Sequence, residues 1–344
     1  MQLDKHGFLR PVIDETKCIK CGLCTKKCPW IKKIQSPNCI FEFPITYAAY
    51  AKNSAIRRES SSGGIFSILA LEILKQDGAI IGVAQLNTTS FQHIIIQNEE
   101  DLRKLRGSKY VQAEPGKIYR ETKKLLQKNI KVLFSGTPCQ IAALYSYLGE
   151  RHYENLWTID IVCHGTPSIK LLEKYNQEIE CRTNGEIIYS NFRDKISGWK
   201  QFSMTQVIKC HNGTIHHESH SLLNDLFLKL FLSNICLNSS CYNCKYNGIP
   251  RIADITLGDF WGIKKFHPEM DDDKGTSVVL INNSKGDTLF NRIKSQIIFC
   301  RSELNKAINS NPCILRSYPP NTQTNDFLND IDVFSLKELL KNIK

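Results

Sequence analysis

The residues with the clearest chemistry are four cysteines near the N-terminus, Cys18, Cys21, Cys24 and Cys28, followed by Pro29. Their spacing, C-x2-C-x2-C-x3-C-P, is the bacterial ferredoxin pattern, in which one tight loop carries thiolates to the irons of a 4Fe-4S cluster. A zinc knuckle usually pairs two CxxC or CxxH halves, so zinc is the weaker interpretation. The run therefore predicts an iron–sulfur cluster.

The number of thiolates in this run poses a problem. In two-cluster ferredoxins the fourth cysteine of each run binds the other cluster, so a single run leaves both ligand sets incomplete. Residues 1–17 resemble the stretch between two such runs, and we expect Met1 to be an internal start or the sequence to be truncated. Alternatively Cys39 supplies the missing thiolate or Cys28 folds back, although an idle thiol is the simpler interpretation of Cys39.

A second set of cysteines is spread through the rest of the chain. Cys241 and Cys244 form a CxxC in a basic context, which is half of a metal site. Cys139 and Cys163 each stand where a strand is expected to lead into a helix, and α/β topology places such junctions at one edge of a sheet. Four thiolates suit zinc or a 4Fe-4S cluster, and spacing alone does not separate these metals.

Other reactive side chains have simpler explanations. His164 is either a hydrogen-bond donor or proton carrier beside Cys163, or an ordinary histidine at a helix start. The histidines at 211–220 fit no standard metal spacing and read as a surface strand, and the acidic run 271–273 as a solvated loop. Four further cysteines are expected to be buried apolar thiols: Cys181, Cys210, Cys300 and Cys313. No G-x-S-x-G, Walker A or G-x-G-x-x-G motif occurs, so hydrolase, NTPase and standard dinucleotide-fold interpretations lose support.

The elements that must position these residues alternate between strand and helix patterns in the middle of the chain. We expect strands at 79–84, 93–97, 131–134 and 156–162, and helices at 65–76, 117–128, 139–148 and from 169 to about 180. Thr137 suits an N-cap and Pro138 a first helical position. The remainder predicts β structure near 185–218, helices near 222–232, 287–294 and 335–342, and strands at 253–261 and 277–281.

Length and composition limit the class of protein. The chain has 344 residues, a net charge of +11, 42% hydrophobic and 23% charged residues, which is typical of a globular protein of two or three domains. Its 14 cysteines are too few for a disulfide-stapled secreted scaffold, which carries roughly 8–10% cysteine. No apolar signal segment and no long apolar stretch is visible, so we expect a cytoplasmic protein without a membrane span.

Six motifs in a fixed order carry a specific resemblance: Ser60-Ser-Ser-Gly-Gly64, Gly107-Ser-Lys-Tyr110, Ser135-Gly-Thr-Pro-Cys-Gln140, Asp160-Ile-Val-Cys-His-Gly165, Cys241-Tyr-Asn-Cys244 and Asp254-Ile-Thr-Leu-Gly-Asp-Phe-Trp261. With the leading ferredoxin run, the chain resembles the coenzyme F420 hydrogenase/dehydrogenase beta-subunit family, in its bacterial branch with an N-terminal 4Fe-4S ferredoxin-type domain. The resemblance implies an α/β (α+β) mixed-sheet flavoprotein body with a small N-terminal ferredoxin-like iron–sulfur module. One departure is the single cysteine run, where the family's domain normally has two.

The resemblance also assigns parts and residues. It implies a ferredoxin-type module at 1–44, incomplete at its N-terminus, an N-terminal α/β part of the body at 45–180, and a C-terminal part at 181–344. Besides the N-terminal run, it implies a body cluster on Cys139, Cys163, Cys241 and Cys244, with Cys236 as the reserve ligand. The flavin-contacting loops correspond to Ser61, Ser62, Gly63, Gly64, Ser108, Lys109, Tyr110, Gly258, Asp259 and Phe260.

The chemistry of these loops agrees with a flavin. The segment 61–64 precedes a helix, whose N–H groups and dipole favour a diphosphate, although a capped helix start has the same sequence. Lys109 would neutralise phosphate and Tyr110 would stack on a ring. The alternative interpretation is that Lys109 is a solvated lysine and Tyr110 a core tyrosine. The segment 259–261 would place a carboxylate and aromatic faces near the isoalloxazine. The alternative interpretation is ordinary packing at a strand end.

The sequence therefore predicts an iron–sulfur flavoprotein oxidoreductase. It would pass electrons between 4Fe-4S clusters, at least one N-terminal and one in the body, and FAD to a deazaflavin, nicotinamide or organic substrate. The substrate, the use of coenzyme F420, the direction of flow and the catalytic residues stay open.

The expected partner is a redox protein or small electron carrier, without nucleic acid, and the chain would act as an oligomer or a complex subunit. An acidic carrier would dock on the basic surface of Lys17, Lys20, Lys26, Lys27, Lys32 and Lys33. The alternative function is a basic, zinc-stabilised nucleic-acid-binding protein, which leaves the SSSGG, GSKY and GDFWG motifs unexplained.

Overall fold

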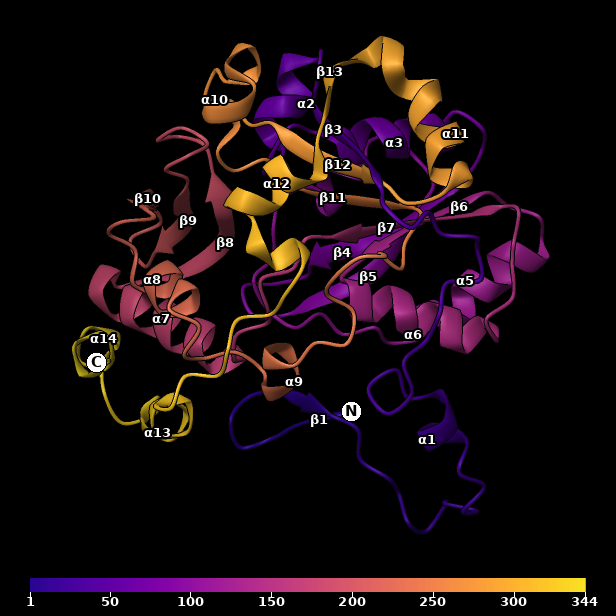
Figure 1. Ribbon diagram of the computed structural model, residues 1–344. Coiled ribbons are helices and arrows are strands. Elements are labelled where there is room, and N and C mark those ends of the chain that lie inside the picture. Colours follow the sequence, from indigo (N-terminus) through magenta and orange to yellow (C-terminus); the bar gives the residue numbers. More distant parts are fainter. Residues whose placement is uncertain (344) are drawn as a thin grey trace.

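An eight-stranded sheet forms the centre of the computed structural model, which describes residues 1–343 (Figure 1). Its strands lie in the order β13-β3-β12-β11-β7-β6-β4-β5. In that order their bounds are Ile297–Ser302, Ile45–Ala51, Ser277–Ile281, Ile255–Asp259, Leu156–Ile161, Val132–Gly136, Ala79–Gln85 and Phe91–Ile96. β3, from before residue 180, lies between β13 and β12 from after it, so the two parts of the body share one sheet.

The middle of the sheet is parallel and covered on both faces. β11, β7, β6 and β4 pair in parallel, whereas the outer strands pair antiparallel. Helices α3 (Ile65–Leu74) and α11 (Ser284–Ile293) pack together with the core on one face, and α5 (Ile118–Gln127) and α6 (Pro138–Leu148) with the core on the other. Burial on both faces explains the nearly continuous apolar sequence of the parallel strands.

The helix α6 shows how local sequence fixes an element. Thr137 is its N-cap and forms a capping box with Gln140, Pro138 is its first residue, and Gly149 ends it in the left-handed conformation. These are the residue types that satisfy free N–H groups at a helix start and permit a positive φ at its end. The expected cap and first position are both confirmed.

A smaller antiparallel sheet lies beside the central one, at the left of Figure 1. It contains β8 (Gly185–Asp194), β9 (Ser203–Cys210) and β10 (Ile215–Ser221). Its inner face packs with α7 (Ile169–Thr183), α8 (Leu226–Leu232) and the C-terminal α14 (Leu336–Asn342) in a second apolar core. The two sheets face a common space, which holds the cavity described below.

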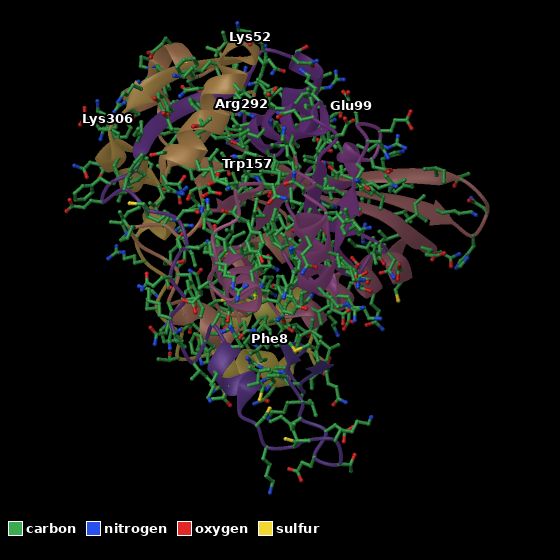
Figure 2. All side chains as sticks on the ribbon, turned by 90° about the vertical axis from the view of Figure 1, so that its right-hand side faces the viewer. Phe8, Lys52, Glu99, Trp157, Arg292 and Lys306 are labelled. Carbon is green, nitrogen blue, oxygen red and sulfur yellow. The ribbon has the colours of Figure 1, made fainter. Side chains whose placement is uncertain are left out.

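The N-terminal segment lies at the bottom of Figure 1, outside both sheets. A hairpin of β1 (Gln2–Leu3) and β2 (Leu9–Arg10) docks near α9 (Ser239–Tyr242), and α1 (Leu23–Lys27) follows. Phe8, labelled in Figure 2, joins the apolar core behind the small sheet and is 2% exposed. Below Phe8, the side chains of this segment extend away from the body (Figure 2).

The remaining short elements connect these layers. They are α2 (Ser54–Glu59), α4 (Leu102–Leu105), α10 (Ile263–Phe266), α12 (Leu304–Ser310), α13 (Thr324–Asp330) and the 3-10 turns η1 (Pro268–Met270), η2 (Lys294–Gln296) and η3 (Pro312–Ile314). Within residues 1–343 the longest helix is α7 with 15 residues, and no helix is both long and apolar enough to cross a membrane.

The mixed sheet with a small N-terminal segment confirms the predicted fold class. Two expected helix starts move to a capping residue: α8 begins after Asp225, not at Leu222, and α11 begins after Asn283, not at Asp287. In both cases the cap side chain accepts a hydrogen bond from a backbone N–H inside the first turn, which fixes where the helix starts. The strands β3 and β13 were not expected.

Candidate functional site

Two of the predicted cysteines leave neighbouring strands at the same edge of the central sheet. β6 and β7 are adjacent and parallel. Cys139 is the second residue of α6, which follows β6, and Cys163 stands two residues beyond the end of β7. The expectation that both strand-to-helix junctions share one edge is confirmed.

The CxxC segment is brought to this edge by backbone pairing. The loop after Cys163 bonds to residues 236–238: the N–H of Asn238 donates to the carbonyl of Thr166 at 2.8 Å, and the N–H of Ser168 donates to the carbonyl of Cys236 at 2.9 Å. A Cβ at Gly165 would lie 3.5 Å from the Cβ of Cys241. The same Cβ would lie 2.8 Å from a methyl of Leu237, and this clash, together with a φ of +138°, explains why the loop carries glycine here.

The four thiols of Cys139, Cys163, Cys241 and Cys244, here called the cysteine quartet, interact with one another. Cys139 is exposed at the sheet edge, and Cys163, Cys241 and Cys244 are half-buried. Desolvation of the thiol and then the neighbouring quartet thiols raise the pKa of Cys139 to about 11, and the same two causes raise the pKa of Cys163 well above its ordinary value. Thiols with raised pKa values stay protonated at neutral pH unless a metal takes the proton's place. Cys236 lies apart from the quartet, with its thiol against the carbonyl of Leu230 at 3.6 Å.

The spacing of the quartet is wider than a zinc ion requires. Within residues 1–343, the group of three metal-binding atoms that lie mutually within 4.8 Å is His267, Glu269 and Cys300, so no three quartet thiols are that close. A zinc ion with Zn–S bonds of about 2.3 Å holds its sulfurs about 3.8 Å apart. The donor set, four thiols around a wider space, fits a polynuclear iron–sulfur cluster.

A cavity of about 760 Å³ opens next to the quartet, between the two sheets. Cys163 itself lines the cavity, as does Thr137, whose hydroxyl lies 3.1 Å from the Sγ of Cys139. Eight of the ten predicted cofactor residues line it: Ser61, Ser62, Gly64, Ser108, Lys109, Tyr110, Gly258 and Asp259. The other two, Gly63 and Phe260, do not.

The serine–glycine loop is fixed in place at one wall of this cavity. The N–H of Ser108 donates to Ser61 Oγ at 2.8 Å, and Lys195 Nζ donates to the carbonyl of Ser62 at 2.6 Å. Gly63 faces the sheet, where a Cβ would lie 2.4 Å from the carbonyl oxygen of Ala49. Gly64, with a φ of +83°, is the N-cap of α3, so the free N–H groups of this helix begin beside the cavity.

Lys109 differs from its expected role. Its ammonium donates to the carbonyls of Leu105 and Arg106 at 3.1 and 2.7 Å, and burial lowers its pKa to about 7. The side chain therefore closes the end of α4 and is not a free counter-charge for phosphate. Tyr110 lies between the rings of Phe192 and Phe231 and borders the cavity.

The residues of the GDFW segment divide between the cavity and the core. Gly258, Asp259 and Trp261 line the cavity, whereas Phe260 is 1% exposed in the core. A Cβ at Gly258 would lie 2.8 Å from a methyl of Val162, so glycine is needed for close packing there. The aromatic face that the sequence predicted at this point belongs to Trp261.

Two residues that hold this wall were missed from the sequence: Arg193, which lines the cavity, and Trp199, which is buried behind it. Arg193 in β8 forms a buried ion pair with Asp259, and the indole N–H of Trp199 donates to the same carboxylate at 2.7 Å. Trp199 also stacks on Trp261, with centroids 4.9 Å apart and planes 8° from parallel. No motif surrounds either residue, and their role arises only because the small sheet packs over the end of β11.

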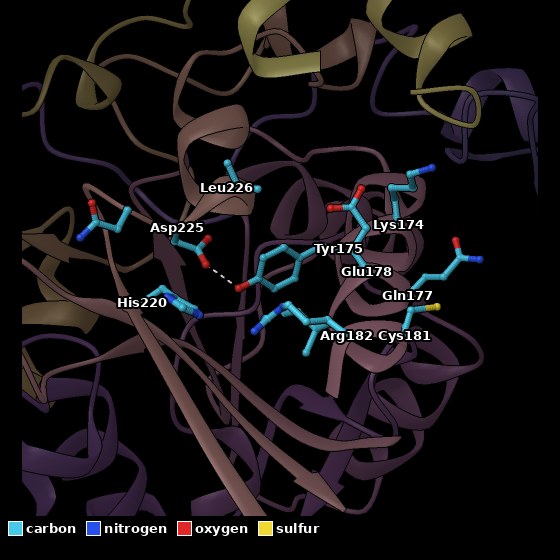
Figure 3. Close-up of a pocket in the computed structure, with 11 residues that line it drawn as sticks. Lys174, Tyr175, Gln177, Glu178, Cys181, Arg182, His220, Asp225 and Leu226 are labelled. Carbon is cyan, nitrogen blue, oxygen red and sulfur yellow. Dashed lines mark hydrogen bonds between the residues drawn. The ribbon is translucent and has the colours of Figure 1, made fainter. Parts of the chain in front are cut away.

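A second cavity, of about 730 Å³, lies between α7 and the start of α8 (Figure 3). Its charged groups are engaged with one another: the hydroxyl of Tyr175 donates to Asp225, as the dashed line in Figure 3 marks, and Arg182 pairs with Glu218. It contains none of the predicted site residues. We therefore place the candidate site at the larger cavity.

The N-terminal cysteine run reaches the quartet through Tyr246. Cys18, Cys21 and Cys24 are exposed, and Cys28 is half-buried. The hydroxyl of Tyr246 donates to the carbonyl of Pro29 at 2.7 Å and accepts from the N–H of Ile34 at 3.1 Å. The same hydroxyl interacts electrostatically with Cys28 and with the quartet members Cys139 and Cys244.

Comparisons with known proteins agree with this geometry. Residues 46–118 match the family described as coenzyme F420 hydrogenase/dehydrogenase, beta subunit N-term, and residues 130–306 match its C terminus. Residues 11–30 match a 4Fe-4S binding domain. The family resemblance drawn from the six motifs is confirmed.

Two individual proteins are also similar. An uncharacterized protein of Methanocaldococcus jannaschii is 30% identical over 133 residues, which cover 38% of this chain and 37% of that protein's length. A chain in a structure of the F420-reducing NiFe hydrogenase complex from Methanosarcina barkeri superposes with a TM-score of 0.51 at 16% identity, over 87% of this chain and 89% of that one. This second likeness concerns the fold.

Proposed function

The chain belongs to the coenzyme F420 hydrogenase/dehydrogenase beta-subunit family, and on that premise we propose that it is an iron–sulfur flavoprotein oxidoreductase. Its 4Fe-4S binding domain match at residues 11–30 supports cluster-based electron transfer. The finer part of the proposal is that FAD occupies the larger cavity and that the cysteine quartet holds a second 4Fe-4S cluster.

The observation that carries the proposal is the contact between quartet and cavity. Cys163 belongs to the quartet and also lines the cavity, so a cluster on one side and a planar cofactor on the other would lie against each other. Direct electron transfer between two cofactors requires a short separation of this kind. No mobile carrier is then needed between them. A nucleic-acid-binding protein would have no use for this arrangement.

The residues of the cavity fit the parts of FAD. The cavity volume of about 760 Å³ lies in the range of cofactor sites, which is about 300–1,000 Å³. Ser61 and Ser62, with the start of α3, would hold the diphosphate, because they offer hydroxyl and backbone N–H donors beside a helix N-terminus. Tyr110 and Trp261 would line the flat ring. Bound FAD supplies the exchange between one-electron and two-electron chemistry.

The chain's own contribution is positioning and exclusion of water. The bonds of Ser108 to Ser61 and of Lys195 to Ser62 hold the serine–glycine loop rigid before any ligand binds. The raised pKa values of Cys139 and Cys163 mean that a metal must displace the protons of these two thiols when it binds. Tyr246 fastens the N-terminal run to the quartet, so electrons entering at the exposed cysteines would have a short path inward.

The proposed partner is an acidic electron carrier that docks on the N-terminal segment. Among the six lysines of this basic surface, Lys17 and Lys32 pair with acidic side chains and Lys27 donates to the carbonyl of Ser146. Lys26 and Lys33 are exposed beside the cysteine run. Exposed charges of one sign accelerate the encounter with a partner of opposite sign.

The test is a pair of cysteine variants of the full chain, purified without air. We expect the wild-type protein to be brown, with iron, sulfide and releasable FAD. Replacing Cys241 and Cys244 by Ser should remove the quartet's cluster, so iron should fall by about four atoms per chain if it holds a 4Fe-4S cluster. The matched control is C236A, because Cys236 is buried five residues before the CxxC but lies outside the quartet.

Three results would contradict the proposal or one part of it. Zinc without iron after anaerobic reconstitution would refute the redox function. Equal iron loss in C236A and in the double variant would mean that the quartet is not the ligand set. Iron binding without any FAD binding would refute the cavity assignment while leaving the clusters intact.

A further inference from the structure

The cavity wall contains one cation, Arg193, whose hydrogen-bond donors are only partly used. Arg193 is 6% exposed; its Nη1 bonds to Asp259, whereas Nε and Nη2 make no hydrogen bond of normal length within residues 1–343, although the hydroxyl of Tyr110 interacts with the guanidinium. Leaving buried N–H groups of a charged side chain unpaired costs about 1–3 kcal/mol or more. Because proteins rarely accept that cost without a use, these donors point to a ligand.

The other cations lining the cavity are already engaged. Arg106 pairs with Glu59, Lys109 donates to backbone carbonyls at the end of α4, and Lys200 pairs with Asp271. Arg193 alone, among the described lysines and arginines of this wall, combines burial, a full charge and unpaired donors. Nε2 of His164 is also unpaired at this wall, but among the described lysines and arginines of the wall Arg193 is the one with unpaired donors for an acceptor in the cavity.

Arg193 is also held rigidly. Its guanidinium lies 4.2 Å from the ring centroid of Phe202 and 5.2 Å from that of Trp261, so two aromatic faces fix its plane. Asp259, which holds its Nη1, is itself held by the indole N–H of Trp199 at 2.7 Å. Because neither member of the pair can turn away, the unpaired edge of the guanidinium is preorganised.

The surroundings of Arg193 favour a flat ring over a phosphate. Phe202, Trp261 and Tyr110 border the cavity around it, and aromatic faces of this kind bind planar ligands. The hydroxyl and backbone donors suited to phosphate belong instead to the loop that precedes α3. A planar cofactor whose diphosphate lies at that loop would present its ring to the aromatic residues.

Resting on the proposed function, we propose that Arg193 binds the polar edge of the flavin ring and stabilises the negative charge that the ring gains on reduction. Two electrons, delivered singly by an iron–sulfur cluster or a reduced carrier, and one proton from water convert the neutral ring to a singly charged anion. Arg193 supplies the counter-charge for that anion and gives up no proton. It is a charge-stabilising residue that raises the reduction potential of the bound flavin.

The experiment measures the midpoint potential of bound flavin and the dissociation constants of FAD and riboflavin. In R193M we expect the reduced form to lose at least tenfold more affinity than the oxidised form, which lowers the two-electron potential by about 30 mV or more. Riboflavin binding should weaken in parallel with FAD binding, since riboflavin has the ring but no phosphate. R193K should recover part of the potential, because it keeps the charge without the planar fork.

Further variants keep the test valid if R193M folds poorly, since it leaves the largely buried Asp259 without its charged partner. The double variant R193M/D259N removes the pair together and should also lower the potential. D259N alone frees the guanidinium from its carboxylate and should raise the potential. K200M is the matched control, because it removes one positive charge from the same wall and should shift the potential far less.

Two outcomes would overturn the inference. An unchanged potential in both R193M and R193M/D259N would exclude charge stabilisation at the ring. Weaker FAD binding with unchanged riboflavin binding would assign Arg193 to the diphosphate instead. If the wild-type protein binds neither flavin, the proposed function itself has failed, which is a different result from either of these.

Discussion

At the scale of single residues, burial sets the properties of the ionisable groups, and the two cavities use it differently. Around the larger cavity, burial leaves Arg193 with unused donors. Around the smaller one, Asp225 is buried but fully engaged: it accepts from the hydroxyl of Tyr175 and from the N–H of Leu228, the latter at 2.8 Å. The unused donors of Arg193 are available to a ligand, whereas the hydrogen bonds of Asp225 stabilise the start of α8.

The carboxyl of Asp225 predicts a pH dependence of stability. Burial raises its pKa to about 6 in the folded chain, above the ordinary value of 3.8. The folded state therefore keeps a proton that the unfolded state has released, and this contribution is fully present below about pH 4 and lost as the pH rises through 6. Between pH 5 and 7.5 it amounts to about 1 kcal/mol.

We expect D225N to remove this part of the pH dependence. An amide accepts the N–H of Leu228 and bonds to the hydroxyl of Tyr175 without ionising, so the variant should lose less stability between pH 5 and 7.5 than the wild type. Thermal unfolding across that range measures the difference. D326N, at an exposed position on α13, is the control. Parallel curves for wild type and D225N would contradict the prediction.

At the scale of elements, the parts that sequence predicts well are those with strong local signals. The apolar strands β4, β6 and β7 and the capped helix α6 were predicted within a few residues, because continuous apolar runs and a capping box are unambiguous. The strand β3 was missed because its sequence, ITYAAYA, contains three alanines, which are depleted in strands. Only its pairing with β12 and β13 makes it a strand.

The residues of the candidate site likewise differ in how well the sequence predicts them. Residues in motifs were predicted, and the topology of adjacent parallel strands brought Cys139 and Cys163 together as expected. Arg193 and Tyr246 could not be found, because each acts through partners far along the chain: Asp259 for the first, Pro29 and Ile34 for the second. Long-range hydrogen bonds leave no periodic trace in a sequence.

The attachment of the N-terminal segment depends on one hydroxyl, which gives a second prediction. Y246F removes the acceptor of the Ile34 N–H, and Ile34 is 2% exposed, so a buried donor is left unpaired. The cost of about 1–3 kcal/mol falls on the local docking of residues 29–34. We expect amide hydrogen exchange there to accelerate about tenfold for each 1.4 kcal/mol, with iron content unchanged.

The control for this variant is Y147F, because Tyr147 lies on α6 near the same segment but is 44% exposed. It should leave exchange at residues 29–34 as in the wild type. Unchanged exchange in Y246F would mean that the bonds to Pro29 and Ile34 contribute nothing to docking. Slower reduction of the flavin through the N-terminal cysteines should accompany the loosened segment.

At the scale of the whole molecule, the parts of the body before and after residue 180 do not form separate units. Strands from both complete one sheet, and the larger cavity takes residues from both, such as Ser61 from the first part and Arg193 and Trp261 from the second. The N-terminal segment is different, because Phe8 and Ile34 are buried in the body at its two ends, whereas residues 11–21 between them are exposed. The first cysteine run thus lies on an exposed segment that is anchored to the body on both sides.

That segment carries both exposed lysines and exposed apolar side chains, which leads to the last prediction. Ile19 is 86% exposed, and Val12, Ile13 and Leu23 are also exposed beside the cysteine run. An acidic carrier would be drawn by charge and then held by apolar contact. We expect K26Q/K33Q to slow reduction of the protein by an acidic ferredoxin about threefold to thirtyfold at low salt.

The control removes the same charge elsewhere. K264Q/K265Q lies at α10, on the side of the body away from the N-terminal segment in Figure 1, and should change the rate little. In about 0.5 M salt the screening length falls to a few ångströms, so the difference between the two double variants should vanish. Equal slowing in both would show that net charge alone matters. An effect of K26Q/K33Q that persists in high salt would point to a direct contact, and no effect at any salt would place the docking surface elsewhere.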